Sequence, residues 1–242
     1  MTRARRSRLD PAEYERKTYP KLGGRYASEV EISDVLRLSG KTSTALEVGM
    51  GTGRVFTRLA TRSAYLVGID PDVSMAKHTS DRMTSSSDAK QPNFDLLVAD
   101  GEHLPFRDAV FDSVVCVRVL RYFDGPGKAI ENICRVLRPR GRLVLEFTNI
   151  LRPQTLLQIP RYLLHREFYP RLFERKRVEK WISGRGMRIN QVLGWHKLPV
   201  ELLGLTNNQS FLRALVLIER ILQRISPPEF MSRSLVVSAT KE

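Results

Sequence analysis

The chain of 242 residues is long enough to bury a substantial core in one domain, and its 42% apolar and 27% charged residues are ordinary for a globular protein. No apolar run approaches the ~20 residues of a membrane-spanning helix, and no apolar segment follows the N-terminal arginines, so neither a spanning helix nor a secretory signal is expected. The two cysteines, Cys116 and Cys134, form no metal-binding pattern, which favours a cytoplasmic protein without a metal site or disulfide.

The positive charge is concentrated at the two ends of the chain. Of the net charge of +14, residues 1–24 carry +4 and residues 151–242 carry +9, whereas residues 25–150 carry only +1. This distribution favours an anionic partner, such as a phosphate-bearing substrate, nucleic acid or an anionic membrane surface. Because Arg outnumbers Lys 30 to 10, the arginine bias of a GC-rich genome explains the charge equally well, and both interpretations stay open.

The first predicted elements are two helices. Asp10, Pro11 and Glu13 form a helix start, with a capping residue, Pro at the first helical position and an acid three residues after the cap. A second helix is expected from Ser28 to Leu38. From there on strands and helices alternate. Strands are expected over 44–48, 65–69, 94–99, 113–117 and 142–147, and helices over 54–61, 73–83 and 129–137.

The end of the chain departs from this alternation. Two more strands are expected over 187–195 and 234–239, separated by an insertion at about 197–231. Apolar strands separated by helices are typical of a parallel sheet with helices on both faces. The sequence therefore predicts an α/β domain of Rossmann-like type.

A glycine-rich turn follows the first expected strand. Residues 45–53 read ALEVGMGTG, so a strand enters a turn that opens a helix. Glycines permit positive φ and a close approach of the backbone, and the N–H groups at a helix start bind a carboxylate or phosphate. A dinucleotide-binding turn would have its third glycine at position 54. That residue is Arg54, and the pattern is GxGxG instead.

Acidic residues end the next two strands. The carboxylate of Asp70 can accept hydrogen bonds from both hydroxyls of a ribose, although it could also cap the helix that follows. Asp100 ends the third strand and can accept from an exocyclic amine such as that of adenine. Ligands of open α/β sheets bind at the carboxyl ends of strands. Three motifs at three successive strand ends therefore predict a ligand site with more specificity than any one of them.

Residues 44–147 resemble the class I S-adenosylmethionine-dependent methyltransferases, in particular the broad group that includes the ubiquinone/menaquinone-type enzymes. The resemblance rests on LEVGMGTG, VGIDPDVSMAKH, ADGEHLPFRDAVFDSVVCV and RVLRPRGRLVLEF, in that order. It implies a seven-stranded, mostly parallel sheet with order 3-2-1-4-5-7-6 and strand 7 antiparallel. It also implies S-adenosylmethionine as cofactor and S-adenosylhomocysteine as product.

The resemblance also implies a domain plan and site residues. Residues 1–24 would be a basic tail and helix, and 25–242 one domain, with a cofactor-binding core over 44–147 and substrate-lid elements at about 149–171 and 197–231. Glu47 and the glycine turn would line the methionine half of the cofactor, Asp70 would bind the ribose, and Asp100 would hold the adenine. The implied cofactor-binding residues are Glu47, Gly49, Gly51, Thr52, Gly53, Asp70, Pro71, Asp100, Gly101, Glu102, Val117 and Arg118.

No catalytic residue is identified from the sequence. Methyl transfer is an in-line displacement from a sulfonium, so positioning and exclusion of water supply much of the rate, and a base is required only if the nucleophile must lose a proton. Relatives often carry a histidine pair after strand 4, where this chain has Arg121 and Tyr122; Arg121 could bind an anionic substrate group or be a surface residue. The substrate-side candidates are Arg25, Arg121, Tyr122, His165 and His196.

A further helix is expected inside the insertion. Phe211, Leu215, Ile218, Leu222 and Ile225 fall on one face, and three arginines group on another. The preferred interpretation is a helix packed over the active site with its arginines in water. A basic amphipathic helix lying on an anionic membrane is the alternative.

The leading hypothesis is a methyltransferase acting on a small-molecule or lipid-like acceptor. The alternatives are an RNA or protein methyltransferase that uses the basic ends, and a non-catalytic scaffold with the same fold. Nucleic acid is not favoured because no RNA-binding appendage is recognisable. The scaffold is disfavoured because Glu47, Asp70 and Asp100 are all present. The acceptor, the methylated atom, peripheral membrane contact and the oligomeric state are left open by the sequence.

Overall fold

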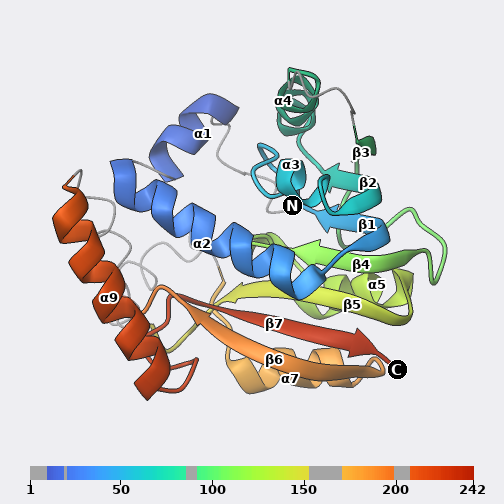
Figure 1. The fold of residues 1–242 in the computed structure, drawn as a ribbon. Coiled ribbons are helices and arrows are strands. Elements are labelled where there is room, and N and C mark those ends of the chain that lie inside the picture. The colour runs from blue at the N-terminus through green and yellow to red at the C-terminus, as the bar shows by residue number, and fades with distance from the viewer. Residues whose placement is uncertain (1–9, 19–20, 86–91, 153–170, 199–207) are drawn as a thin grey trace.

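The computed structural model describes residues 10–18, 21–85, 92–152, 171–198 and 208–242. Seven strands form one sheet in the order β3-β2-β1-β4-β5-β7-β6 (Figure 1). Strands β1 to β5 are parallel, and β7 runs antiparallel to its neighbours β5 and β6, so the predicted Rossmann-like topology is confirmed. The strands are β1 (Thr42–Val48), β2 (Ser63–Asp70), β3 (Asn93–Val98), β4 (Phe111–Cys116), β5 (Leu137–Thr148), β6 (Met187–Trp195) and β7 (Ser234–Lys241).

Helices cover both faces of this sheet (Figure 1). Successive side chains of a strand point to opposite faces. In β4, Val115 therefore packs with Phe56 of α3, whereas Val114 packs with Ile133 of α5. Helices α2, α3 and α4 cover the first face, and α5 and α7 cover the second. The described helices are α1 (Pro11–Thr18), α2 (Lys21–Ser39), α3 (Phe56–Leu59), α4 (Val73–Thr84), α5 (Pro126–Val136), α7 (Arg175–Ser183) and α9 (Gln209–Ile225).

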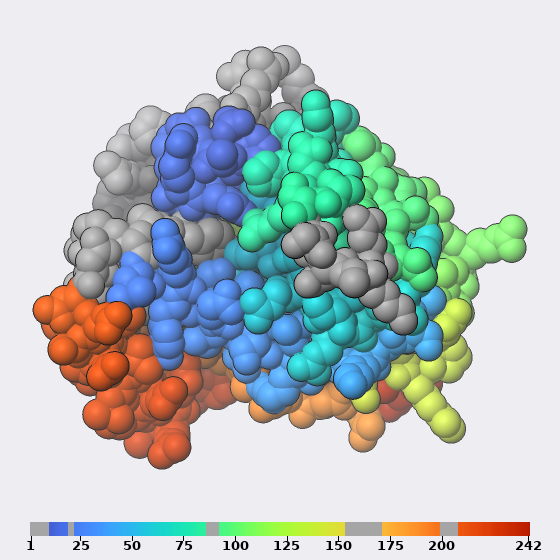
Figure 2. Space-filling model, turned by 45° about the horizontal axis from the view of Figure 1, so that its top comes forward, coloured from blue at the N-terminus to red at the C-terminus, as the bar shows by residue number. Residues whose placement is uncertain are grey.

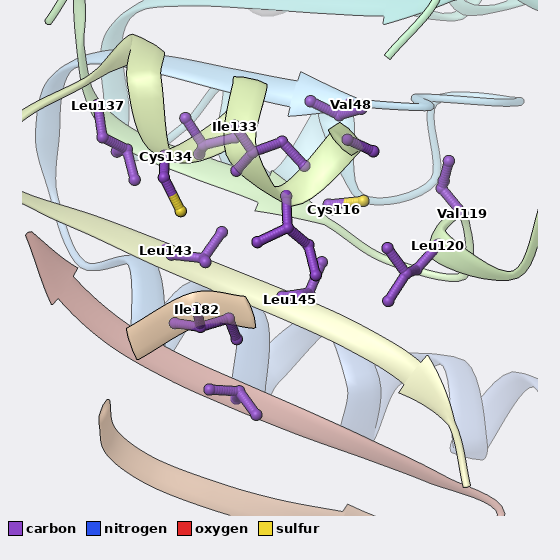
Figure 3. Close-up of a cluster of buried hydrophobic side chains, with 14 of the residues drawn as sticks. Val48, Cys116, Val119, Leu120, Ile133, Cys134, Leu137, Leu143, Leu145 and Ile182 are labelled. Atoms are coloured by element: carbon purple, nitrogen blue, oxygen red, sulfur yellow. The ribbon is translucent and has the colours of Figure 1, made fainter. Parts of the chain in front are cut away.

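The core between the sheet and the α5 side contains both cysteines (Figure 3). Cys116 and Cys134 are free and buried among aliphatic side chains. Burial raises the pKa of the Cys134 thiol to about 12, and burial also raises the pKa of Cys116. Because the thiolate is the reactive form, both residues act as small apolar core residues.

The second helix begins earlier than predicted. It was expected from Ser28, but α2 starts at Lys21 and continues through Gly23 and Gly24. Glycine weakens a helix by about 1 kcal/mol relative to Ala, and tertiary packing compensates here because Leu22 and Tyr26 pack against α9. The division expected at residue 24 therefore falls inside α2.

Strand β5 also begins earlier than predicted. It was expected over 142–147, but the strand starts at Leu137, directly after α5. Leu137 pairs with Phe111, and the register then shifts before pairing resumes between Ser113 and Arg142. The residues between Leu137 and Arg142 are therefore an irregularity inside the strand. Helix α3 is shorter than the expected 54–61.

Helix α9 lies beside the N-terminal part of α2, on the side where β1, β4 and β5 end (Figure 1). It is the described part of the insertion expected at 197–231. Most of the other expected lid element, 149–171, lies outside the described residues. Among the helices in the described part of the chain, none is long and apolar enough to cross a membrane.

Candidate cofactor site

The glycine turn after β1 has a backbone that glycine adopts most readily. Gly49, Gly51 and Gly53 have φ values of +75°, +54° and +77°. A Cβ at Gly49 would lie 2.3 Å from Cγ2 of Val119, and one at Gly53 would lie 2.9 Å from the side chain of Thr79. At Gly51, no atom of the described residues lies within 4 Å of the Cβ position. The turn is therefore tightly packed on both sides of an open centre.

Hydrogen bonds fix this turn to the end of β2. The N–H groups of Gly49 and Met50 donate to the carbonyl of Ile69, at 2.8 and 3.0 Å. The N–H of Gly51 donates to Oδ2 of Asp70 at 3.0 Å, and the hydroxyl of Thr79 donates to the Gly51 carbonyl at 2.9 Å. These bonds hold the open centre of the turn in a fixed position.

Asp70 serves two backbone segments at once. While Oδ2 accepts from the glycine turn, Oδ1 accepts from the N–H of Asp72 at 3.0 Å. Each carboxylate oxygen can accept more than one hydrogen bond, so one carboxylate can serve both segments. Asp72 in turn caps α4, because its side chain accepts from the N–H of Ser74. Capping of this helix was the alternative role considered for Asp70, but the structure assigns the cap to Asp72.

Glu47 is a buried acid beneath the glycine turn. Burial raises the pKa of its carboxyl well above the ordinary value; Arg54 opposes this rise and Asp70 adds to it. Oε2 of Glu47 is buried and has no hydrogen-bond partner among the described residues. A buried acceptor without a donor is costly. A ligand donor such as an ammonium group would satisfy it.

The two acids predicted to lie near the adenine, Asp100 and Glu102, differ in how many hydrogen bonds their carboxylates accept within the protein. Asp100 is exposed, with Oδ1 accepting from the N–H of Glu102 at 2.9 Å. The carboxylate of Glu102 accepts from the N–H groups of Asp124 and Gly125, at 2.6 and 2.8 Å. Glu102 therefore holds the two residues that lead into α5. Asp100 has the more accessible carboxylate for an adenine amine.

A buried ion cluster next to the glycine turn joins α2 to three other segments of the chain. Glu31 of α2 lies 2.9 Å from Nη2 of Arg54, 2.6 Å from Nη2 of Arg118 and 2.9 Å from Nε2 of His196. Its side chain is 1% exposed. Arg54 follows the glycine turn, Arg118 follows β4 and His196 follows β6. The cluster therefore fixes α2 to the ends of strands on both halves of the sheet.

The charges of the cluster determine the state of its acid. Burial alone would raise the pKa of Glu31, but Arg118, the hydrogen bond with His196 and Arg54 together outweigh burial and hold the pKa well below the ordinary value. Glu31 was not among the predicted site residues. The signal was present, because Glu31, Val35 and Leu38 lie at helical spacing on one face, and an acid on an apolar face needs partners.

The backbone after β4 is also held by a buried acid. Arg118 has a φ of +63°, an unusual value for a residue with a side chain. Its N–H donates to Oε2 of Glu146 on β5 at 2.7 Å, while its side chain reaches Glu31. This bond compensates for strained backbone at the position where Val117 and Arg118 were expected to approach the cofactor.

The substrate-side candidates are dispersed. His196 belongs to the Glu31 cluster, and Nη2 of Arg121 lies 3.3 Å from Oε1 of Glu146. Tyr122 is half exposed, with the Arg121 guanidinium 5.9 Å from its ring centre. Arg25 is exposed on α2, and His165 lies outside the described residues. Arg121 and Tyr122 thus lie next to each other after β4, and the other described candidates lie elsewhere.

The fold and the glycine turn agree with comparisons to known proteins. Residues 46–145 match the family model for a methyltransferase domain. An O-methyltransferase from Aspergillus nomiae is 36% identical over 101 residues, which cover 41% of this chain and 44% of that protein. A ubiquinone/menaquinone biosynthesis C-methyltransferase from Pseudomonas paraeruginosa is 38% identical over 119 residues, which cover 47% of this chain and 46% of that protein. The matches thus span about half the length of these curated relatives.

A solved structure extends the likeness of the fold to nearly the whole chain. It is a methyltransferase from Thermotoga maritima, described as a possible histamine N-methyltransferase, with a TM-score of 0.66 and 21% identity over 96% of this chain and 95% of that one. The solved structure shows that the Rossmann-like fold is shared over nearly the whole chain. Residues 46–145 match the methyltransferase domain, in agreement with the resemblance found in the sequence.

Proposed function

We propose that this protein transfers a methyl group from S-adenosylmethionine to a small-molecule or lipid-like acceptor. One observation carries the proposal: the glycine turn with its open centre at Gly51 follows the buried acid Glu47 of β1 and is hydrogen-bonded to a second buried acid, Asp70 of β2. A cofactor with an ammonium group and a ribose matches these acceptors. The bound cofactor would supply a methyl group activated by a sulfonium.

The residues of this chain would bind and orient the cofactor. Glu47 would accept a hydrogen bond from its ammonium group, and the buried Oε2 would thereby gain the partner that it lacks among the described residues. Asp70 would accept hydrogen bonds from the ribose hydroxyls, and the exposed carboxylate of Asp100 would face the adenine amine. Gly51 would allow the ligand to lie directly on the backbone.

Glu102 and Arg118 would contribute to this site through the backbone. The Glu102 carboxylate holds the start of α5, and the Arg118 side chain belongs to the Glu31 cluster. Their side chains would therefore position the site rather than bind the cofactor. In-line transfer would then depend on alignment and on exclusion of water, without an assigned base.

The acceptor class is inferred from the curated relatives and from the charge distribution. The two relatives are named as an O- and a C-methyltransferase, and the second is named for ubiquinone and menaquinone biosynthesis. Residues 151–242 carry a net charge of +9. These features support an acceptor with an apolar body, and an anionic group on that acceptor would suit Arg121 next to Tyr122.

Calorimetric titration with S-adenosylmethionine and S-adenosylhomocysteine tests the cofactor site. In Gly51→Ala the new methyl group would occupy the open centre of the turn, and we expect binding to weaken by about 10-fold or more. Gly186→Ala is the matched control. Gly186 also has positive φ (+68°) and also lacks described atoms within 4 Å of the Cβ position, but it precedes β6 at the opposite end of the strands.

Both glycine substitutions introduce a similar backbone strain of about 1–2 kcal/mol. A weaker cofactor affinity in Gly51→Ala alone would therefore not be an effect of strain. Equal cofactor affinity in the two variants would remove the glycine turn from the site. Absence of binding by the folded wild-type protein would overturn the proposed activity. Once binding is established, release of S-adenosylhomocysteine with apolar acceptors, soluble acceptors and RNA identifies the acceptor class.

A further inference from the structure

Helix α9 is apolar on two separate faces. Leu212 and Leu215 are buried and pack towards Leu22 and Tyr26 of α2. A second face points to solvent, although its side chains are large and apolar. Its residues are between 46% and 73% exposed: Phe211, Leu217, Ile218, Ile221 and Ile225. The sequence-based expectation was wrong here, because Phe211, Ile218 and Ile225 were expected on the packed face.

The exposed apolar residues form one continuous strip. At about 100° per residue, the strip covers roughly 120° of the helix circumference, from Leu217 to Phe211. Three exposed arginines, Arg213, Arg220 and Arg224, form a row directly beside the Leu217 edge of this strip. The single acidic residue of α9, Glu219, is on the packed side. The outer face of α9, meaning this strip with its arginine row, therefore combines apolar surface with positive charge.

The helix is firmly attached in this orientation. The carboxylate of Glu219 accepts from the N–H groups of Lys197 and Leu198, at 2.9 and 2.8 Å. The side chain of Asn208 caps the first turn by accepting from the N–H groups of Ser210 and Phe211. The exposure of the outer face therefore follows from how α9 is anchored. In Figure 2, α9 forms an orange-red corner of the molecule beside α2.

A contiguous exposed apolar patch marks an interaction surface. We propose that the outer face of α9 docks onto an anionic membrane surface. Large apolar side chains beside a row of arginines are the pattern of a helix that lies in the plane of the membrane interface, with its apolar strip among the acyl chains and its cations at the headgroups. The arginine row provides the charge complementarity, and the net charge of +9 over residues 151–242 adds to it.

A second copy of the chain fits this surface less well. In an antiparallel two-fold pair of α9 helices, the two arginine rows would lie on the same side of the interface. The described outer face contains no acidic residue of α9 to neutralise them. A phospholipid surface instead supplies both the apolar phase and the negative charge.

Docking would also orient the site. Glu219 is bonded to residues directly after β6, so α9 is fixed at the carboxyl ends of the strands, where the cofactor turn also lies. The membrane would then adjoin the edge of the sheet at which a lipid-like acceptor has to enter. Membrane binding itself does not depend on the proposed methyl transfer, because it needs neither cofactor nor acceptor.

Co-sedimentation of the full chain with phosphatidylcholine vesicles, with and without phosphatidylglycerol, tests the proposal. We expect binding to the anionic vesicles only, weakening as salt concentration rises. Replacing Arg213, Arg220 and Arg224 together by Gln should weaken binding on the order of 100-fold, at about fivefold per arginine. The charge-matched control replaces three exposed arginines at the opposite edge of the sheet, Arg62, Arg140 and Arg188, and should bind as the wild type does.

A second pair of variants tests the apolar strip. Ile218→Gln with Ile221→Gln should abolish vesicle binding, whereas Ile218→Leu with Ile221→Leu should retain it, and circular dichroism checks that all variants are folded. Absence of binding to anionic vesicles would overturn the proposal, as would equal loss in the Arg62/Arg140/Arg188 control. Light scattering would also overturn the proposal if it showed a wild-type dimer that dissociates in the Ile218→Gln/Ile221→Gln variant. The outer face of α9 would then be an interface with a second copy of the chain.

Discussion

The two sides of the strand-end edge are held together by different kinds of contact. On the cofactor side, backbone groups of the glycine turn bond to β2, the adjacent strand, through Ile69 and Asp70. On the proposed acceptor side, the ends of β5 and β6 are fixed by side chains that reach across long sequence separations. Asn149 donates to the carbonyls of Glu229 and Ser232, and Lys197 donates to those of Pro227 and Phe230.

This difference separates a part of the site that depends on backbone conformation from a part that depends on side-chain identity. A site made of backbone tolerates few residue types, and its pattern is recognisable in a short stretch of sequence. A site made of distant side chains can be rebuilt by many residue combinations. The matched segment, 46–145, ends within β5. The acceptor side therefore lies mostly beyond the segment shared with the curated relatives.

Glu31 connects the two sides, because it contacts Arg54 after the glycine turn and His196 after β6. Its replacement therefore tests how much this connection contributes to stability. In Glu31→Ala, Arg54 and Arg118 would lose their shared buried carboxylate, and we expect unfolding free energy to fall by about 3–5 kcal/mol. Glu29→Ala on the same helix is the matched control, because Glu29 is exposed and lies 3.6 Å from Arg58. Its change should stay within about 0.5 kcal/mol. Urea denaturation measures both.

The pH dependence sharpens this prediction. The pKa of Glu31 is lower in the folded protein than in the unfolded chain. Its contribution to stability is therefore complete above the ordinary pKa of 4.5 and is lost as pH falls below that value. The wild type should lose this contribution in acid and Glu31→Ala should not. Equal acid sensitivity of the two proteins would show that the cluster does not hold α2 in place.

Glu47 lies on the proposed cofactor side, and its effect on stability should change with pH in the direction opposite to that of Glu31. Its folded pKa is raised by burial, so between pH 4.5 and that raised value the folded state binds more protons than the unfolded state. Wild-type stability should fall as pH rises through this window, by up to about 1.4 kcal/mol per pH unit. Glu47→Gln cannot ionise and should lack this slope. Thermal or urea unfolding of both proteins without cofactor, over a pH series, measures the difference.

Glu47 also links stability to cofactor binding. If the carboxylate accepts from a cofactor ammonium group, S-adenosylmethionine should reduce the wild-type pH slope, and Glu47→Gln should bind it roughly 10- to 100-fold more weakly. Gln is the appropriate replacement because it keeps the size of the buried side chain. Cofactor affinity identical to that of the wild type would leave the buried Oε2 without the proposed partner.

The sequence predicted the strands and the glycine turn of this half of the sheet because their signals are local, each within a few residues. The strand order was predicted from the resemblance over residues 44–147, and the structure confirms it. The roles of the predicted cofactor-binding residues stay predictions. Helix α7 was not predicted, because its sequence RKRVEKWIS is mostly charged and its two buried residues, Val178 and Ile182, give only one turn of periodicity. Glu31 and Glu219 were missed for a related reason: their partners are distant in sequence, and each residue alone resembles a surface acid.

The smallest expected effect concerns the start of α9. Asn208 caps this helix through two backbone N–H groups, and Asn208→Ala should cost about 1 kcal/mol. Asn208→Ser, which keeps an acceptor at the cap, should cost much less. Because α9 is joined to the domain by Glu219 and by Leu212 and Leu215, the loss should be local. Hydrogen exchange should speed up in α9 of the Ala variant while the amides of β1 and β4 keep wild-type protection. Faster exchange in those strands as well would mean that the acceptor side unfolds together with the cofactor side, and that the two are one cooperative unit despite their different contacts.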